Sequence, residues 1–414
     1  MDLQTIIAKN ILHLLDQGKS TQSELSAYLN ISRQTLSNYL KGTSTMDCVK
    51  LVQTAEFFHV PVTSLLTDSR MSQTTMLFRS ALNYQDAVND IEPLVKAYIS
   101  RYEDLIKISG NISCFLPEQH SLFIDQKGQK ISINYEYRNI APSELTITSV
   151  LEREILEIAD HQRKLLQLNQ AGAISLIPAL ISRGIKIIFK DFHSDEIYGL
   201  SICDENKGCF IFVNTNKTIT IERQLFTIAH EFGHIILHRP LFMQQIHDAI
   251  TPQFALFLDK MADKFAGRLL CPPDMLFSYA ERLHEAKNDL RIILPIAIRI
   301  KKRAQVSLQS VMMGLRNCRL ISYSVLNEFY NMLDATNSRK HEPYPISADC
   351  ELLEEFNKQK NNHILELIKE TYSSAHTSAD DVAFLLDCDI DLANAIISDF
   401  VKELNSTNSW FLNI

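Results

Sequence analysis

The feature that most constrains this chain is the short motif His230-Glu-Phe-Gly-His234. It lies in an apolar segment whose pattern predicts one helix from about Ile221 to His238, ended by Pro240. On a helix, residues at i and i+4 share one face, with their imidazoles about 6 Å apart. Two ring nitrogens can then bind one Zn²⁺ ion at about 2.0–2.1 Å. The motif therefore predicts a metal-binding helix, and the alternative is a core helix whose histidines are satisfied by hydrogen bonds.

Glu231 and two aspartates supply the other groups that such a site needs. Glu231 follows the first histidine directly, where a carboxylate can take a proton from a water molecule and pass it to a leaving amine. A catalytic zinc also needs a third protein ligand and one open position. A second predicted helix, from about Pro252 to Leu270, carries Asp259 and Asp263 one turn apart on one face. Both aspartates are candidates for a role at the metal.

These two helices resemble the ImmA/IrrE family of metallopeptidases. The resemblance rests on the segments RQLFTIAHEFGH and FLDKMADKFAGRLLCP, and the family shows a pattern close to E-x-E-A-N-x-F-A-x-x-L-L-M-P after its H-E-x-x-H. Counted back from Pro272, the family's glutamate ligand falls on Asp259, and Asp263 takes a position usually held by Asn or Asp. The resemblance thus implies a Zn²⁺ cofactor, with His230, His234 and Asp259 as ligands, Glu231 as the catalytic residue and Asp263 as a supporting carboxylate.

The chain departs from the family pattern at two positions. Asp259 is one methylene shorter than glutamate, which could weaken metal affinity or turnover. Met261 stands where the family has a second acidic residue, so one candidate supporting carboxylate is absent. The resemblance also extends back through two predicted strands and covers about residues 150–275. His238 could approach the site, but we expect it at the surface of the helix end.

Residues 21–42, with the sequence TQSELSAYLNISRQTLSNYLKG, have the pattern of a helix-turn-helix. Thr21 and Glu24 predict a capping box, and Ser32 is expected to open the second helix. The pattern resembles the XRE, or lambda-repressor-like, family over about residues 1–68, which implies a five-helix domain and a double-stranded DNA operator as partner. Polar residues at the helix starts are expected to contact the DNA: Gln22, Arg33, Gln34, Thr35, Ser37 and Asn38. The alternative is a small helical domain that binds protein.

The charge of the N-terminal segment bears on how it would bind DNA. Residues 1–70 hold six basic and six acidic residues, so one copy has only a modest electrostatic attraction to phosphates. Two half-site contacts would add, and we therefore predict a homodimer. The net charge of −8 for the whole chain argues against indiscriminate nucleic-acid binding.

The remaining sequence divides into further predicted segments. Residues 69–115 are expected to form a helical linker and possible dimerisation element, with one helix over about 72–109. Residues 116–275 are expected to form a zincin-like domain, with a hairpin around Lys127-Gly128 and strands at 184–190 and 208–214. Residues 276–335 and 336–414 are expected to be a helix-turn-helix-like extension and a C-terminal helical module. The predicted fold is thus multidomain and mainly α, with one small α+β domain.

Composition limits where such a protein would work. The eight cysteines include no C-x-x-C pair, which favours reduced thiols in a cytoplasmic protein over a disulfide framework or a thiolate zinc site. No run of about 18 apolar residues is present, so we expect no membrane partner. A basic cluster at 299–319 could touch phosphates, although a solvated helix face is the expected explanation.

The combination of the two motifs resembles bacterial and prophage-associated regulators. The first hypothesis is a DNA-binding transcriptional regulator with a zinc-dependent endopeptidase domain, which cleaves a protein substrate such as a partner repressor in a stress or mobile-element response. The second hypothesis is a non-catalytic transcription factor whose peptidase-like domain senses metal or a small ligand. A third, an antitoxin-like role, rests only on the helix-turn-helix.

Overall fold

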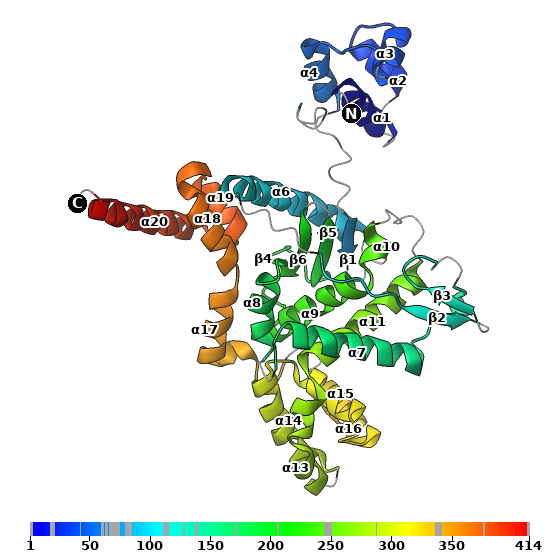
Figure 1. The fold of residues 1–414 in the computed structure, drawn as a ribbon, viewed down its shortest axis with the longest axis vertical. Helices are drawn as coiled ribbons and strands as arrows, with labels where there is room; N and C mark the ends of the chain where they lie inside the picture. The colour runs from blue at the N-terminus through cyan, green and yellow to red at the C-terminus, as the bar shows by residue number, and fades with distance from the viewer. Residues whose placement is uncertain are drawn as a thin grey trace. The chain divides into compact units, whose positions relative to one another are not determined.

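The computed structural model describes residues 3–16, 21–41, 43–58, 62, 65, 75–78, 85–110, 116–126, 129–136, 140–169, 172–204, 207–243, 251–286, 288–335, 342–375 and 377–411. The chain forms two compact units, Met1–Thr74 and Thr75–Ile414, and the finer domain boundaries given above stay predictions. It is mainly helical with one small mixed sheet, as predicted at this level (Figure 1). Within the described ranges, no helix is long and apolar enough to span a membrane.

The first unit is a small bundle of helices. Its described helices are α1 (Leu3–Asp16), α2 (Gln22–Tyr28), α3 (Arg33–Leu40) and α4 (Cys48–Phe57). Thr21 and Glu24 form the predicted capping box at α2, and Ser32 caps α3. Its core is built from apolar side chains of all four helices, among them Ile7, Ile11, Leu25, Leu29, Leu36, Leu40 and Leu51. The fifth helix expected for a repressor-like domain would fall within 59–74, most of which lies outside the described residues.

The second unit is built around a four-stranded sheet with the strand order β1-β5-β6-β4. The strands are β1 (Thr75–Phe78), β4 (Lys186–Lys190), β5 (Gly199–Asp204) and β6 (Gly208–Asn214). β5 pairs antiparallel with both β1 and β6, whereas β4 and β6 are parallel. The predicted strands at 184–190 and 208–214 correspond to β4 and β6. The strand β5 was not predicted.

The single helix predicted over 72–109 is wrong in its first part. Residues 75–78 form β1, and helix α6 begins only at Gln85 and ends at Ser109. β1 pairs along the edge of β5, from Thr75 opposite Cys203 to Phe78 opposite Leu200. A run of only four residues has too little pattern to separate helix from strand. The free edge of β5, which offers unpaired backbone groups, decides the outcome.

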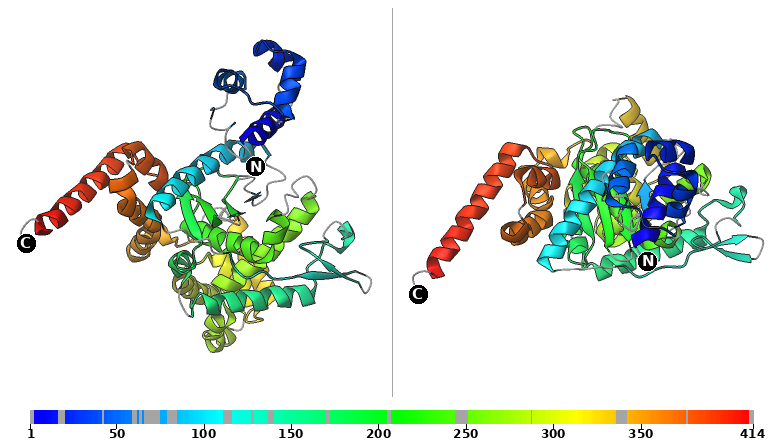
Figure 2. Two further views of the ribbon diagram at one scale, coloured as in Figure 1. Left: turned by 45° about the horizontal axis from the view of Figure 1, so that its top comes forward. Right: turned by 90° about the horizontal axis from the view of Figure 1, so that it is seen from above.

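Different helices cover the two faces of the sheet (Figures 1 and 2). Along β6, Phe210 and Phe212 belong to one apolar cluster and Ile211 and Val213 to the other, because successive strand side chains point to opposite faces. The first cluster includes α6, where the ring of Tyr98 meets that of Phe212 edge-on at 5.6 Å between centroids. The second includes α9 (Ile221–Leu237) and α11 (Pro252–Leu270), whose bounds match the two predicted helices. Helix α9 is therefore buried in the core.

Shorter elements complete this part of the fold. The predicted hairpin is formed by β2 (Phe123–Gln126) and β3 (Gln129–Ser132), although its turn at 127–128 lies outside the described residues. Four helical elements among the described residues follow β3 and precede β4 in the sequence: η3 (Pro142–Glu144), α7 (Ser149–Leu165), η4 (Ala173–Ser175) and α8 (Leu176–Ile181). A fifth, α10 (Arg239–Met243), follows α9.

The C-terminal third is helical, as predicted. It comprises α12 (Pro273–Phe277), α13 (Ala280–Glu285), α14 (Leu290–Ala304), α15 (Leu308–Asn317), α16 (Tyr323–Ala335), η6 (Ile346–Ala348), α17 (Cys350–Gln359), α18 (Asn362–Ala375), α19 (Ala379–Leu386) and α20 (Ile390–Phe411). Val382 and Leu385 of α19 are buried in the cluster that contains α6. The Tyr98 hydroxyl of α6 donates a hydrogen bond to the Leu385 carbonyl oxygen at 2.9 Å. Helices α18, α19 and α20 therefore pack on the same face of the sheet as α6.

Lys301, part of the basic cluster expected on a solvated helix face, is instead buried. Its side chain is 3% exposed, and its Nζ lies 2.7 Å from Glu222 Oε1 and 3.5 Å from Glu342 Oε1. Glu222 stands in the first turn of α9 and also accepts the backbone N–H of Ile346 at 2.8 Å. This buried ion pair joins the start of α9 to α14. Sequence pattern could not predict this ion pair. Lys301 stands in a run of basic residues whose next two members, Lys302 and Arg303, are exposed as expected, and nothing in the run marks Lys301 as different.

Candidate metal centre

The candidate centre lies between α9 and α11, and α9 rests on β5. A Cβ atom at Gly199 of β5 would lie 2.4 Å from Thr227 Cγ2 and 2.6 Å from the Phe212 carbonyl oxygen. Any side chain there would therefore push α9 away from the strand. This close approach buries the motif residues of α9, and His230 and Glu231 are 0% exposed.

The two histidines of the motif and Asp259 of α11 converge on one point. The Nε2 atoms of His230 and His234 are 3.0 Å apart, and Asp259 Oδ1 lies 3.4 Å from His234 Nε2. One ligand atom from each of the three residues lies within 4.8 Å of the others. Ligand atoms bound at about 2.0–2.1 Å to one tetrahedral zinc are about 3.3 Å apart. The donor set and its spacing therefore fit a single shared metal ion.

Asp263 lies behind the first histidine. Its Oδ1 is 2.8 Å from His230 Nδ1, so the carboxylate can accept the Nδ1–H of that imidazole. A proton held on Nδ1 leaves the lone pair on Nε2, which faces His234. Met261, at the position where the family pattern has a second acid, is 0% exposed and belongs to the apolar core. In this chain that position of α11 faces away from the candidate ligands.

Glu231 is held by a residue that was not among the predicted site residues. Its Oε2 accepts a hydrogen bond of 2.8 Å from Ser201 Oγ on β5, and Ser201 is 0% exposed. The only available signal was the alternation of Leu200, Ser201 and Ile202, which places a polar side chain on the face opposite two apolar ones. Because β5 was not predicted as a strand, this alternation could not be connected to Glu231.

His238, which was expected at the surface, is fully buried, so that prediction is wrong. Pro240 lies in the next short helix, α10, and this helix packs against the core with Leu241 at 0% exposure. The chain therefore stays buried past the end of α9. His238 Nδ1 lies 3.0 Å from His234 Nδ1. Burial lowers the pKa of His238 well below its usual value, and the positive charge of His234 and His230 lowers it further.

The charge environment differs on the other side of His234. Burial disfavours its imidazolium form, but a hydrogen bond with Asp259 and the negative charges of Glu231, Asp259 and Asp263 outweigh burial and raise the pKa of His234. The carboxylates thus create a place that attracts positive charge. A metal cation would meet the same attraction.

An open groove of about 330 Å³ borders this centre. It is lined by Leu145, Thr146, Ile147, Phe257, Lys260, Asp263 and Lys264, and Asp263 is the residue that contacts His230. The Asp263 side chain is 46% exposed, whereas that of His230 is 0% exposed. Solvent therefore reaches the edge of the centre along α11.

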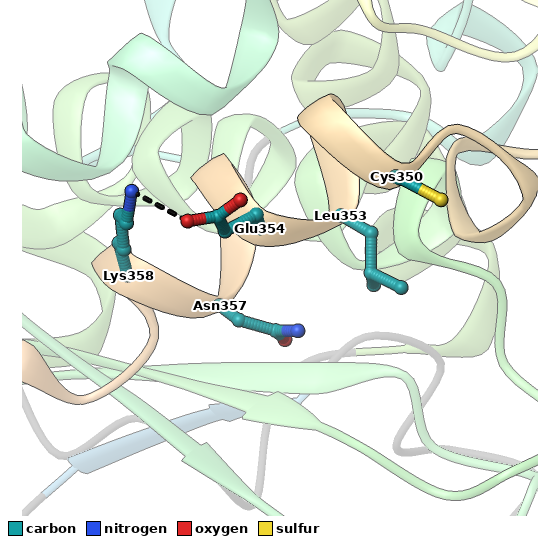
Figure 3. Close-up of a pocket in the computed structure, with 5 residues that line it drawn as sticks. All are labelled: Cys350, Leu353, Glu354, Asn357 and Lys358. Atoms are coloured by element: carbon teal, nitrogen blue, oxygen red, sulfur yellow. Dashed lines mark ion pairs between the residues drawn. The ribbon is translucent and has the colours of Figure 1, made fainter.

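A second hollow, of about 440 Å³, lies on α17 and is lined by Cys350, Leu353, Glu354, Asn357 and Lys358 (Figure 3). Glu354 and Lys358 form an ion pair of 2.8 Å, and both side chains are 69% exposed. The hollow therefore presents surface charges that already satisfy each other. It contains none of the predicted site residues.

The predicted DNA-contacting residues lie on α2 and α3 of the first unit. Gln22 opens α2 and is exposed, and Arg33 and Gln34 are exposed at the start of α3. Thr35, Ser37 and Asn38 are partly buried. Gln34 Nε2 donates a hydrogen bond of 3.3 Å to Asn38 Oδ1. Arg33 and Gln34 are thus the most accessible members of the set on α3.

Comparison with known proteins bears on the second unit. Residues 182–316 match the Peptidase_M78 family, described as the IrrE N-terminal-like domain. The matched segment contains β4, β5, β6, α9 and α11, and with them His230, His234 and Asp259. No helix-turn-helix family was detected, and no curated protein matches the chain.

Proposed function

From this family match and the geometry of the centre, we propose that the second unit is a zinc-dependent endopeptidase. The observation that carries the proposal is the convergence of the buried His230 and His234 with the partly buried Asp259, with Glu231 between the two histidines in the sequence. Imidazole nitrogens and a carboxylate oxygen are ligands that Zn²⁺ accepts, and three protein ligands leave the fourth position open for chemistry.

Each residue has a definite task in this proposal. A bound zinc ion would polarise the peptide carbonyl and make a water molecule easier to deprotonate. Glu231 takes the proton of that water and delivers it to the leaving amine. Ser201, which donates to Glu231 Oε2, restricts that carboxylate to one orientation. Asp263 holds the Nδ1 proton of His230.

The metal content of the purified full chain tests the centre. We expect about one zinc per chain after expression with added zinc, and loss of zinc in His230→Ala and Asp259→Ala. A wild-type chain without zinc under these conditions would contradict the proposed centre. Elemental analysis gives the answer without knowledge of the substrate.

The side chain of Asp259 favours a second candidate function, a metal-sensing or ligand-sensing regulator that cleaves nothing. Asp259 is one methylene shorter than the glutamate of the family pattern. The variant Glu231→Gln separates the two functions, because the glutamine can still accept from Ser201 but cannot take a proton. Cleavage by the wild type of a denatured-protein mixture, with loss of about 10²–10⁴-fold in Glu231→Gln and unchanged zinc content, supports the peptidase. Absence of cleavage by the zinc-loaded wild type supports the sensor.

We propose further that the first unit binds a double-stranded DNA operator as a homodimer. The support is the capped α2–α3 pair, with Gln22 at one helix start and Arg33 and Gln34 exposed at the other. The joint proposal is a transcriptional regulator whose peptidase cleaves a repressor-type protein, a partner or a second copy of this chain, in a stress or mobile-element response.

Selection of bound duplexes from a random-sequence library tests the DNA proposal. An enriched sequence with two half-sites is expected, and binding should weaken in Arg33→Ala and Gln34→Ala but not in Glu56→Ala, an exposed position on α4. Sedimentation should show two chains per duplex. No enrichment, or equal binding by all variants, would instead favour a protein-binding helical domain.

A further inference from the structure

Three histidines follow one another at a spacing of four residues, His230 and His234 in α9 and His238 at its C-cap, and the middle one contacts both neighbours. His234 Nε2 lies 3.0 Å from His230 Nε2, and His234 Nδ1 lies 3.0 Å from His238 Nδ1. The two nitrogens of His234 therefore face different groups. One faces the candidate ligand atoms, and the other faces an imidazole that no role described above requires.

The chemistry of imidazole sets the direction of the hydrogen bond between these residues. A neutral imidazole carries one N–H and one lone pair on its two nitrogens. A metal ligand must offer the lone pair, so the proton of His234 lies on Nδ1 when Nε2 binds the ion. His234 Nδ1–H then donates to His238 Nδ1, and His238 carries its own proton on Nε2.

His238 would be a poor choice for packing alone. It is 0% exposed, and its Nε2 atom is buried without a hydrogen-bond partner among the described residues. A buried polar atom without a partner destabilises a fold, whereas an apolar side chain of similar size would not. The surrounding backbone is fixed independently, because Asn134 Nδ2 donates to the Leu237 carbonyl oxygen at 2.9 Å. The useful atom of His238 is thus its Nδ1.

We propose that His238 is a positioning residue for the metal centre: it accepts the Nδ1–H of His234 and so keeps the Nε2 lone pair of His234 directed at the ion. The two histidine ligands then have different supports, a partly exposed carboxylate from Asp263 and a buried neutral imidazole from His238. This inference rests on the proposed metal centre and deepens it.

Two substitutions separate this role from packing. His238→Leu fills the space but removes the acceptor, whereas His238→Asn places an amide oxygen close to the position of Nδ1. Loss of a group that supports a metal ligand weakens metal binding by about 10–100-fold. We expect His238→Leu to bind Zn²⁺ about 10–100-fold more weakly than the wild type, and His238→Asn to recover most of this loss.

The affinities are measured by competition with a chromophoric zinc chelator, using the full chain. Thermal unfolding of the zinc-free proteins shows whether each variant is folded. Zinc affinity of His238→Leu equal to that of the wild type overturns the inference. Equal weakening in His238→Leu and His238→Asn also overturns it, because that result is expected of a packing residue.

A second measurement keeps the inference distinct from the metal centre itself. In the zinc-loaded, ¹⁵N-histidine-labelled protein, where Nε2 of His234 binds the ion, the inference predicts a protonated Nδ1 on His234 and an unprotonated Nδ1 on His238. A wild type that binds zinc but has a protonated His238 Nδ1 overturns the inference alone, whereas a wild type that binds no zinc overturns the proposed metal centre and the inference with it.

Discussion

Replacement of Lys301 by methionine tests the buried ion pair that joins α9 to α14. The methionine keeps most of the side-chain volume but leaves Glu222 and Glu342, whose side chains are 1% and 8% exposed, without their positive partner. Removing one partner of a buried ion pair costs about 3–5 kcal/mol of stability. We expect a loss of this size at pH 8 for the unit that contains the metal centre.

The loss should depend on pH in a defined direction. Burial raises the pKa of Glu342, and a hydrogen bond from the Leu308 N–H together with the charge of Lys301 opposes this. A carboxyl group whose pKa is higher in the folded state than in the unfolded state binds more protons when folded, so its contribution to stability falls as pH rises from the unfolded value to the folded value. Without Lys301, less opposes the effect of burial, so the pKa of folded Glu342 rises further. The pH range over which this group reduces stability therefore extends to higher pH. The variant should therefore lose less stability at pH 5 than at pH 8, by up to about 1.4 kcal/mol per pH unit within the window.

Urea unfolding of the full chain, followed by circular dichroism at the two pH values, measures both quantities. Lys302→Met is the matched control, because Lys302 is the next residue and its side chain is 71% exposed; this change should leave the unfolding curve almost unaltered. Equal unfolding curves for the two variants at pH 8, or the same loss for Lys301→Met at both pH values, would refute the reasoning.

Three further predictions concern the site and its supports. Asp259→Glu should keep about one zinc per chain, and by restoring the family's ligand it should bind zinc at least as tightly as the wild type in a chelator competition; release of the metal would argue against Asp259 as a ligand. Gly199→Ala should destabilise the chain by about 1–3 kcal/mol, because its Cβ would lie 2.4 Å from Thr227 Cγ2; an unchanged melting temperature would show that α9 can move from β5. Tyr98→Phe should cost about 1–3 kcal/mol, because the buried Leu385 carbonyl oxygen loses its 2.9 Å hydrogen bond; an unaltered denaturation midpoint would contradict this.

Much of the centre could be predicted from local spacing. The interval between His230 and His234 places two imidazoles on one face of any helix, and the prolines at 240, 252 and 272 mark the limits of the segments that hold α9 and α11. The caps at Thr21 and Ser32 are also local, since each side chain bonds a backbone N–H three residues further on. Such features depend on a few neighbouring residues.

The contacts that complete the centre were beyond the reach of local pattern. Ser201 reaches Glu231 across 30 positions of sequence, and Lys301 reaches Glu222 across 79. Residues 75–78 were predicted as helix, because their local pattern does not show the pairing with β5. That pairing selects the extended form. His238 was expected at the surface because it stands at a helix end. It is buried because α10 packs against the core directly after it, which local pattern does not show.

The sequence by itself thus determined which residues can share a helix face and where the helices of the centre begin and end, because these depend on backbone geometry within a few turns. Only the tertiary structure decided which face is buried, which strand supports Glu231 and which histidine supports His234. Those outcomes depend on which distant segments meet, and burial then decides whether a serine, a lysine or a histidine is a surface residue or part of the core.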